Sequence, residues 1–206
     1  AKAQTAAWPD GYGRQVFDSV DSTLSEAARQ SPQLSGATWI LAQEQTAARG
    51  RRGRSWATPR GNFAATLMMR RTEAPSTAAL RSFVASLALR RAFVATTRDE
   101  DAFSLKWPND VLLNGGKVAG ILLESIGDFL AIGIGVNLAH APGADQVEAG
   151  ALRPVSVVAE TGKVVPPEVF LNALAAEYAQ LETQFQTYGF APIRAAWLTH
   201  AARLGE

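Results

Sequence analysis

The 206-residue chain has no cysteine and only two histidines, and both shortages limit its chemistry. Without cysteine it can form neither a disulfide nor a thiolate zinc site, which fits a reducing compartment. His140 and His200 lie far apart in the sequence without partners at metal-ligand spacing, so we assign them surface or structural roles. No apolar run reaches the roughly 18 residues of a membrane-spanning helix, and no signal-peptide pattern opens the chain. We therefore expect a cytoplasmic protein without a membrane partner.

The chain also has almost no net charge, since 20 basic residues face 19 acidic ones. This balance argues against a general nucleic-acid-binding protein. Familiar catalytic signatures are missing as well: there is no P-loop, no Gly-x-Ser-x-Gly turn, no zinc-helix motif and no kinase motif. A length of 206 residues with 47% apolar residues suits one domain with a buried core. We predict a single domain over residues 1–206, with an irregular lead-in over residues 1–13.

Positive charge is concentrated in residues 45–62, which contain five arginines and no acid. The arginines are Arg49, Arg51, Arg52, Arg54 and Arg60. Gly50, Gly53 and Gly61 break regular structure here and let the backbone come close to a ligand. Guanidinium groups offer paired donors to carboxylate and phosphate oxygens, and Trp56 offers an aromatic face to a base. Taken alone, such a stretch is more typical of a solvated basic loop or a nucleic-acid patch than of an active site.

Hydrophobic periodicity predicts strands joined largely as hairpins, followed by helices. The predicted strands cover residues 15–20, 38–43, 62–70, 103–107, 109–113, 117–125 and 129–137. The predicted helices follow the Asp21-Ser22 cap through Ala28 and then cover residues 76–96, 155–160, 168–188 and 192–203. In the long helix a buried stripe is predicted from Phe170, Leu174, Tyr178, Leu181, Phe185 and Tyr188. We expect an α+β fold with a mixed, mostly antiparallel sheet covered by helices on one side.

The last predicted strand has an unusual face. Ile132, Ile134 and Val136 point one way, so Ala131, Gly133, Gly135 and Asn137 point the other way. Glycine in a strand often marks the close approach of a ligand or of another backbone. We interpret the small face as the floor of a pocket, with tight helix packing as the equal alternative.

Polar residues beside this strand have two interpretations each. Lys117 follows the Asn-Gly-Gly hairpin turn and stands near Asp110, so it can bridge a carboxylate and a phosphate. A plain exposed lysine is the simpler interpretation. Asp110 and Glu124 can hold magnesium or can be ordinary surface acids. Ser22 is a good helix N-cap, and its hydroxyl can instead face a polar ligand.

Four motifs occur together in this sequence. They are Arg49-Gly-Arg-Arg-Gly-Arg54 followed by Trp56, Lys106-Trp-Pro-Asn-Asp-Val111, Lys117-Val-Ala-Gly-Ile-Leu-Leu-Glu124, and Gly133-Ile-Gly-Val-Asn137. In this order and spacing, with Asp21-Ser22-Thr23 ahead of them, they resemble the biotin protein ligase family over about residues 14–204. The resemblance implies that family's catalytic fold, which is similar to the cores of class II aminoacyl-tRNA synthetases.

The resemblance also implies a two-step reaction. Biotin and ATP give biotinyl-5′-AMP and pyrophosphate, and a lysine of a biotin carboxyl-carrier domain, part of a biotin-dependent carboxylase, then takes the biotin. ATP and biotin are thus the expected substrates, and Mg²⁺ is expected with ATP, with Asp110 as its candidate ligand. A monomer and a homodimer both remain open.

Site residues follow from the same resemblance. Catalysis is assigned to Lys117 and Arg51, which would hold the carboxylate and the α-phosphate. Biotin binding is assigned to Ser22, Thr23, Leu24, Gln45, Arg49, Gly50, Arg51, Lys117, Gly120, Gly133 and Gly135. ATP and adenylate binding is assigned to Arg51, Arg54, Trp56, Asn109, Lys117 and Asn137. Simple strand alternation puts Lys117 and Gly120 on opposite faces, so a bulge or a late strand start is needed to reconcile them.

This sequence departs from the family pattern at three places. Ala48 stands where the lid commonly opens with glycine, and Leu24 stands where an asparagine usually follows Ser-Thr. The sequence ends at Glu206, before the small C-terminal β-barrel of the family, and it has no N-terminal helix-turn-helix, so DNA binding is not expected. The alternatives are a lipoate or octanoate ligase and a biotin-binding module that does not complete transfer.

Overall fold

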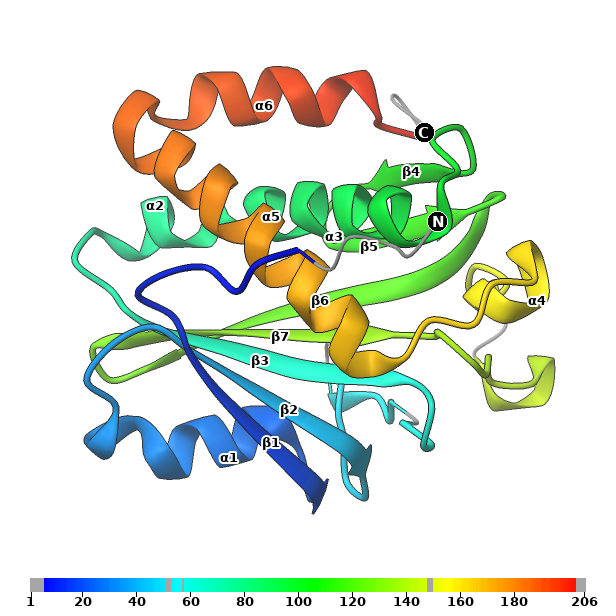
Figure 1. Cartoon of the computed structure of the whole chain (residues 1–206), viewed down its shortest axis with the longest axis horizontal. Helices are drawn as coiled ribbons and strands as arrows, with labels where there is room; N and C mark the ends of the chain where they lie inside the picture. The colour runs from blue at the N-terminus through cyan, green and yellow to red at the C-terminus, as the bar shows by residue number, and fades with distance from the viewer. Residues whose placement is uncertain (1–5, 51–52, 57, 148–149, 203–206) are drawn as a thin grey trace.

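The computed structural model describes residues 6–50, 53–56, 58–147 and 150–202. Within this part of the chain, seven strands form one sheet in the order β1-β2-β3-β7-β6-β5-β4 (Figure 1). The strands are β1 (Gly13–Val20), β2 (Thr38–Gln45), β3 (Phe63–Arg70), β4 (Phe103–Lys106), β5 (Asp110–Leu113), β6 (Gly116–Ile126) and β7 (Phe129–Val136). Only β1 and β2 pair in parallel, and the other five neighbouring pairs are antiparallel. The predicted mixed, mostly antiparallel sheet is confirmed.

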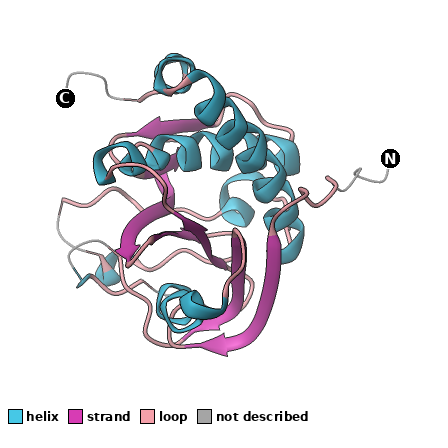
Figure 2. Cartoon of the chain, turned by 90° about the vertical axis from the view of Figure 1, so that its left-hand side faces the viewer, coloured by secondary structure: helices cyan, strands magenta, loops and turns pink. Residues whose placement is uncertain are grey.

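Helices cover both faces of this sheet (Figure 1, Figure 2). They are α1 (Thr23–Gln30), α2 (Pro75–Ala79), α3 (Arg81–Thr97), α4 (Val157–Thr161), α5 (Pro167–Tyr188) and α6 (Phe190–Thr199), with short 3₁₀ turns η1 (Ser31–Gln33) and η3 (Ala144–Gln146). The expectation of helices on one side only was wrong. Leu24 and Ala27 of α1 pack with Ile40, Met68 and Ala131 in a second, smaller core on the opposite face.

The main core lies between the sheet and the layer of α3, α5 and α6. Phe170 meets Phe63 edge-on with ring centroids 5.2 Å apart, and Tyr178 meets Trp39 at 6.0 Å. Of the stripe predicted for the long helix, only Tyr188 was wrong: it is 73% exposed.

Two predicted elements have different boundaries in the structure. The helix expected over residues 76–96 is divided into α2 and α3 at Leu80. There the Leu80 N–H donates to the Thr77 carbonyl, a tighter turn than the α-helical one. The last helix ends at Thr199 rather than at residue 203. The other elements begin and end within a few residues of the predicted positions.

A bulge in β6 settles the predicted conflict between Lys117 and Gly120. Val111 lies opposite Ala119, whereas the next residue, Leu112, lies opposite Lys117, so Val118 is the extra residue of β6. Lys117 and Gly120 therefore share a face: a Cβ placed on Gly120 would lie 3.6 Å from Lys117 Cε. The bulge delivers the lysine to the face that carries the glycines of β7.

The described helices include none that is both long and apolar enough to cross a membrane.

Candidate active site

A cavity of about 810 Å³ opens on the α1 side of the sheet. Its floor includes Gly120 of β6 and Gly133 and Gly135 of β7, and its walls come from the start of α1, from residues 45–50 and 54–56, and from residues 142–147 and 150–154. The predicted site residues that line it are Ser22, Thr23, Leu24, Gln45, Arg49, Gly50, Arg54, Trp56, Asn109, Asp110, Lys117, Gly120, Gly133, Gly135 and Asn137. Arg51, predicted for catalysis and for both substrates, lies outside the described residues. The structure thus collects residues that are more than a hundred positions apart in the sequence.

One end of the cavity is a hydrogen-bonded network of side chains. The Thr23 N–H and hydroxyl both donate to Gln45 Oε1, at 2.7 and 3.2 Å. Because a backbone N–H can only donate, these bonds fix which end of the Gln45 amide is oxygen. Its Nε2 then donates to Thr58 Oγ1 at 2.9 Å, and the buried Thr66 hydroxyl donates to Thr23 Oγ1 at 2.9 Å.

Thr58 and Thr66 were not predicted as site residues. A signal for Thr66 was available, since it is a lone hydroxyl in the otherwise apolar strand β3. Thr58 gave no such signal, because its partner Gln45 lies 13 positions away across the arginine-rich segment. Both threonines act through Gln45 and Thr23 rather than at the cavity floor.

The turn into α1 is fixed by local bonds. Ser22 Oγ accepts the Ser25 N–H at 3.0 Å, so Ser22 is the helix N-cap as well as a cavity residue. Asp21 Oδ1 accepts the Ser22 N–H at 2.7 Å, and Arg29 donates two hydrogen bonds to the same carboxylate. Hydrogen bonding by Arg29 in the first place, and by the Ser22 N–H in the second, lowers the pKa of Asp21 to about 2.

Lys117 supplies a cation to the middle of the cavity. Its Nζ lies 2.9 Å from Asp110 Oδ1 and 5.6 Å from the centroid of the Trp56 ring. Asp110 is thus engaged by the lysine. The described residues contain no group of three or more His, Asp or Glu side chains that could hold a metal ion, so Mg²⁺ stays a prediction with Asp110 as the cavity's carboxylate.

The glycines of the floor are contacted by the protein's own side chains. A Cβ on Gly133 would lie 2.9 Å from Leu24 Cδ1, and one on Gly135 would lie 2.6 Å from Trp56 Cε2. Both contacts are too close for a real Cβ, so each glycine lets a wall side chain rest on the sheet. The two interpretations of this strand face therefore both apply: Gly133 serves helix packing, and Gly135 serves the cavity.

The arginine-rich segment turns back on itself at the cavity. Gly50 N–H donates to the Arg54 carbonyl at 2.6 Å, and Trp56 N–H donates to the Ala48 carbonyl at 3.0 Å. Arg49 reaches across to Glu124 of β6, with Nη2 and Oε2 3.5 Å apart. Ala48 has no left-handed backbone, so alanine fits in place of the glycine common in the family.

Two asparagines flank the other end of the cavity. Asn109 is fastened to β6, because its Nδ2 donates to the Ile121 carbonyl at 2.5 Å and its own carbonyl accepts the Ile121 N–H. Asn137 is buried at the end of β7, where its N–H donates to the Val118 carbonyl and its carbonyl accepts the Val157 N–H.

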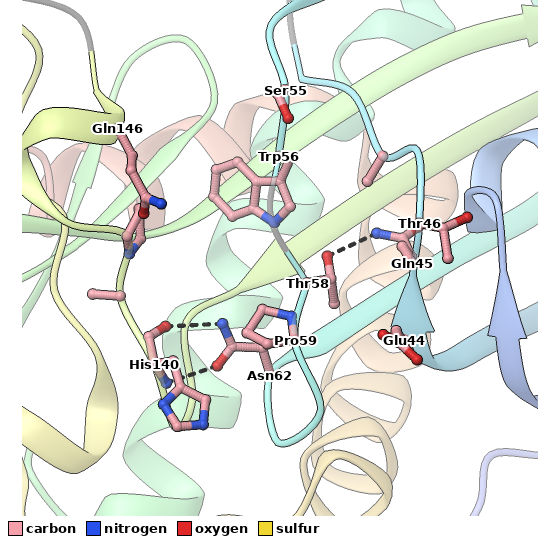
Figure 3. A pocket seen from close by; sticks show the side chains of 13 residues that line it. Glu44, Gln45, Thr46, Ser55, Trp56, Thr58, Pro59, Asn62, His140 and Gln146 are labelled. Carbon is pink, nitrogen blue, oxygen red and sulfur yellow. Dashed lines mark hydrogen bonds between the residues drawn. The ribbon is translucent and has the colours of Figure 1, made fainter.

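A second pocket of about 490 Å³ adjoins the cavity (Figure 3). The two share Gln45, Ala48, Ser55, Trp56, Pro142 and Gln146. Asn62 and His140 lie across this second pocket from Gln45, and hydrogen bonds join them to each other (Figure 3). The shared Trp56 thus stands between the two spaces.

Residues 16–138 match the model of the biotin/lipoate A/B protein ligase family. The chain belongs to this family. A relative from Paracoccus denitrificans, a biotin–[acetyl-CoA-carboxylase] ligase, is 57% identical over 90% of this chain and 80% of its own length. Another ligase of that name, from Mycobacterium tuberculosis, is 35% identical over 68% of this chain and 54% of its own. The chain therefore spans about half of the second relative.

Solved structures of family members share the fold. The biotin protein ligase from Aquifex aeolicus in complex with biotin and ATP has a TM-score of 0.84 at 26% identity, over 94% of this chain and 80% of that one. The Leishmania major ligase in complex with biotinyl-5-AMP has a TM-score of 0.78 at 26% identity, over 96% and 85%. The family resemblance inferred from four motifs is confirmed.

Proposed function

We propose that this chain is a biotin protein ligase that makes biotinyl-5′-AMP and passes biotin to a carrier lysine. The observation that supports this proposal most directly is the order of groups along the floor of one cavity. Leu24 rests at Gly133 and Trp56 at Gly135, and Asn137 follows at the end of β7. Four residues of strand span about 13 Å, which suits an elongated ligand with a ring at each end.

The hydrogen-bonding end supports biotin through its polarity. Thr23 Oγ1 donates to Gln45 and accepts from Thr66, so its remaining lone pair can only accept. The Gln45 amide donates one proton to Thr58 and keeps a second N–H. A ligand with an N–H beside a carbonyl fits both, and the cyclic urea of biotin has that pair. Leu24 then offers an apolar contact to the thioether ring.

Lys117 suits the first reaction step, which joins two anions. A biotin carboxylate oxygen would attack the α-phosphorus of ATP as the bond from that phosphorus to the β-bridging oxygen breaks, and pyrophosphate leaves with the electron pair. A cation between the two reactants offsets their repulsion and the charge of the transition state. Asp110, 2.9 Å away, would hold the ammonium in place. The role of Arg51 stays a prediction from the resemblance.

The second step would place the carrier at the open side of the cavity. The amine of the carrier lysine attacks the carbonyl carbon of the adenylate, and AMP leaves with the phosphate oxygen. We propose Trp56 as the adenine contact, with Arg54, Asn109 and Asn137 near the nucleotide, and Arg49 and Gly50 over biotin. The carrier domain of acetyl-CoA carboxylase is the proposed acceptor, because the Paracoccus relative is named for that substrate.

Two alternatives remain to be separated from this proposal. A lipoate ligase is disfavoured because the dithiolane ring has no group for the Thr23–Gln45 network. The network therefore favours biotin, as do the names of both relatives. A module that binds biotin without transferring it differs only in the second step.

The test is pyrophosphate release by the purified 206-residue chain with ATP and Mg²⁺, in the presence of biotin or of lipoate. We expect release with biotin only, and transfer of labelled biotin to an added carrier domain. Gln45→Leu should raise the KM for biotin, whereas Gln43→Leu, whose amide contacts Glu168 instead, should not. Absence of release with biotin, or equal release with lipoate, contradicts the proposal. Release without transfer indicates the binding module.

A further inference from the structure

Asn62 closes the arginine-rich segment and stands directly before β3, and its side chain is 2% exposed. Its Oδ1 accepts the N–H groups of Ala139 and His140, at 3.0 and 2.9 Å. Its Nδ2 donates to the His140 carbonyl at 2.8 Å (Figure 3). All three bonds of this buried amide thus go to two consecutive residues of the loop that follows β7.

The loop held by Asn62 leads into a wall of the cavity. On one side, Asn137 and Leu138 are held because their carbonyls accept the Val157 and Val158 N–H groups of α4. On the other side the chain continues to Pro142, Gln146 and Val147, which line the cavity. Asn62 therefore fixes the point where the chain leaves the sheet and starts this wall.

Gly61 makes this arrangement possible. Its φ of +94° is left-handed, and a Cβ there would lie 3.0 Å from the Ala139 Cβ. The turn brings the start of β3 against the loop, which lets a short amide side chain span the gap. The segment from residue 58 to residue 62 therefore contacts Gln45 in the cavity through Thr58, and through Asn62 it holds Ala139, two residues after the cavity residue Asn137.

Asn62 makes none of the hydrogen bonds described at the Thr23–Gln45 end of the cavity. The bonds of Thr23 and Gln45 described above come from the start of α1, β2, β3 and Thr58, and none comes from residues 139–142. Loosening the loop should therefore move the wall beside Asn137 and leave the Thr23–Gln45 network in place. A buried asparagine that merely staples a loop would affect the two ends equally, through stability.

We propose that Asn62 is a positioning residue for the nucleotide end of the cavity, acting through Ala139 and His140 on Asn137 and the wall that begins at Pro142. The proposal rests on the function proposed above. As a consequence, the affinities for the two substrates should respond differently to a change at this residue: the amide of Asn62 controls the affinity for ATP and not the affinity for biotin.

The test compares Asn62→Ala with the parent chain. We expect the KM for ATP, from pyrophosphate release at saturating biotin, to rise about fivefold to tenfold, the effect of one or two lost hydrogen bonds. The Kd for biotin, from calorimetry, should stay within about twofold. Hydrogen exchange should accelerate in peptides that cover residues 138–147 and stay unchanged at residues 22–30.

Two further variants complete the test. Asn62→Asp keeps an oxygen for both N–H groups but sets a second acceptor oxygen against the His140 carbonyl, so its KM for ATP should rise as that of Asn62→Ala does. Asn172→Ala is the matched control. The Asn172 amide lies on α5 and accepts a hydrogen bond from Arg14 of β1, so the KM values of this variant should be those of the parent.

Several results would overturn the inference: an unchanged KM for ATP, an equal loss of biotin and ATP affinity, or failure of both Asn62 variants to fold. The last result would make the residue a structural staple. An inactive parent chain would overturn the proposed function instead, and the exchange and biotin measurements on the variants would still decide the role of Asn62.

Discussion

Lys117 and Asp110 neutralise each other's charge within the cavity. Their ammonium and carboxylate lie 2.9 Å apart, and both side chains are largely enclosed. Removing the lysine therefore does more than remove a cation. It also leaves the Asp110 carboxylate facing the space that two anionic substrates would occupy.

Lys117→Ala should lower the rate of adenylate formation about a hundredfold or more, the range seen when one preorganised charge-stabilising group is lost. Adding Asp110→Asn should recover part of that loss, because the uncompensated carboxylate is then gone. Pyrophosphate release measures the rates, and urea unfolding checks that both variants keep the parent's stability. No recovery in the double variant would mean that Asp110 does not repel the substrates.

Gly135 illustrates a residue that works by being small, since Trp56 rests on it. Gly135→Ala should push the indole off the floor and raise the KM for ATP about tenfold, while stability changes by less than about 1 kcal/mol. Pyrophosphate release gives the KM for ATP. Acrylamide quenching of tryptophan emission reports whether the indole has left the floor.

Gly36→Ala is the matched control for that variant. A Cβ on Gly36 meets only the Gly11 carbonyl oxygen, at 3.9 Å, and the residue lies far from the cavity lining. Equal effects of the two substitutions would contradict the contact between Gly135 and Trp56 as the cause.

Among the elements, α3 and α5 are joined by a buried ion pair. Arg81 donates from Nε and Nη2 to the Glu182 carboxylate, with Nη2 and Oε1 2.7 Å apart, and the two residues are 4% and 3% exposed. Tyr178 and Gln186 also donate to Glu182, and Glu73 contacts the Arg81 guanidinium. Burial first, and then the Glu182 charge, raise the pKa of Tyr178 well above its ordinary value.

Arg81→Met should lower the free energy of unfolding by about 3–5 kcal/mol, since it leaves Glu182 buried without its cation. Arg81→Met combined with Glu182→Leu should recover most of that loss, because an apolar pair of similar size needs no desolvation of charge. Urea unfolding measures both. If the double variant is no more stable than Arg81→Met, the buried charge of Glu182 is not the cause of the loss.

At the scale of the whole molecule, stability near neutral pH depends on very few groups, because the chain has only two histidines. Burial, and then the charges of Arg90 and Arg91, lower the pKa of His200 below its ordinary 6.5, while Glu100 opposes them. Below that pH the unfolded chain takes up a proton that the folded chain resists, so acidification favours unfolding.

The free energy of unfolding should therefore fall as the pH drops below about 6.5, and His200→Gln should flatten that fall. Urea unfolding of the parent and of His200→Gln at several pH values below neutral measures it. The depressed carboxylates, such as Asp21, lose their contribution only at lower pH. A slope that persists in His200→Gln would assign it to another group.

The sequence predicted the sheet well, because strand periodicity and the Asn-Gly-Gly turn are local signals. It also predicted the opposite faces of β7, where alternation separates Ile134 from Gly135. The side on which α1 packs could not be derived, since it depends on Leu24 and Ala27 meeting Ile40, Met68 and Ala131 far along the chain. The bulge at Val118 could be named as a possibility but not located, because it depends on pairing with β5.

Residue patterns alone suggested Ser22, Trp56, Lys117 and the small face of β7, and the motif resemblance added the other cavity residues. What the sequence missed are the residues that act through others, Thr58, Thr66 and Asn62. Their partners are distant in sequence, and a threonine or asparagine at a strand end looks the same whether it caps a turn or holds another side chain. Only the folded chain shows which backbone groups their bonds satisfy.

The cavity floor includes β7, which has three strands on either side in the sheet order. Central strands open last during local unfolding, whereas loops open first. The amides of β7 should thus be the slowest to exchange, and those of residues 45–50, 53–56, 142–147 and 150–154 the fastest around the cavity. A bound molecule would therefore enter and leave through movement of the loops that form the cavity walls, while the sheet below them keeps its structure. The residence time of that molecule would then depend on the loops and not on the sheet.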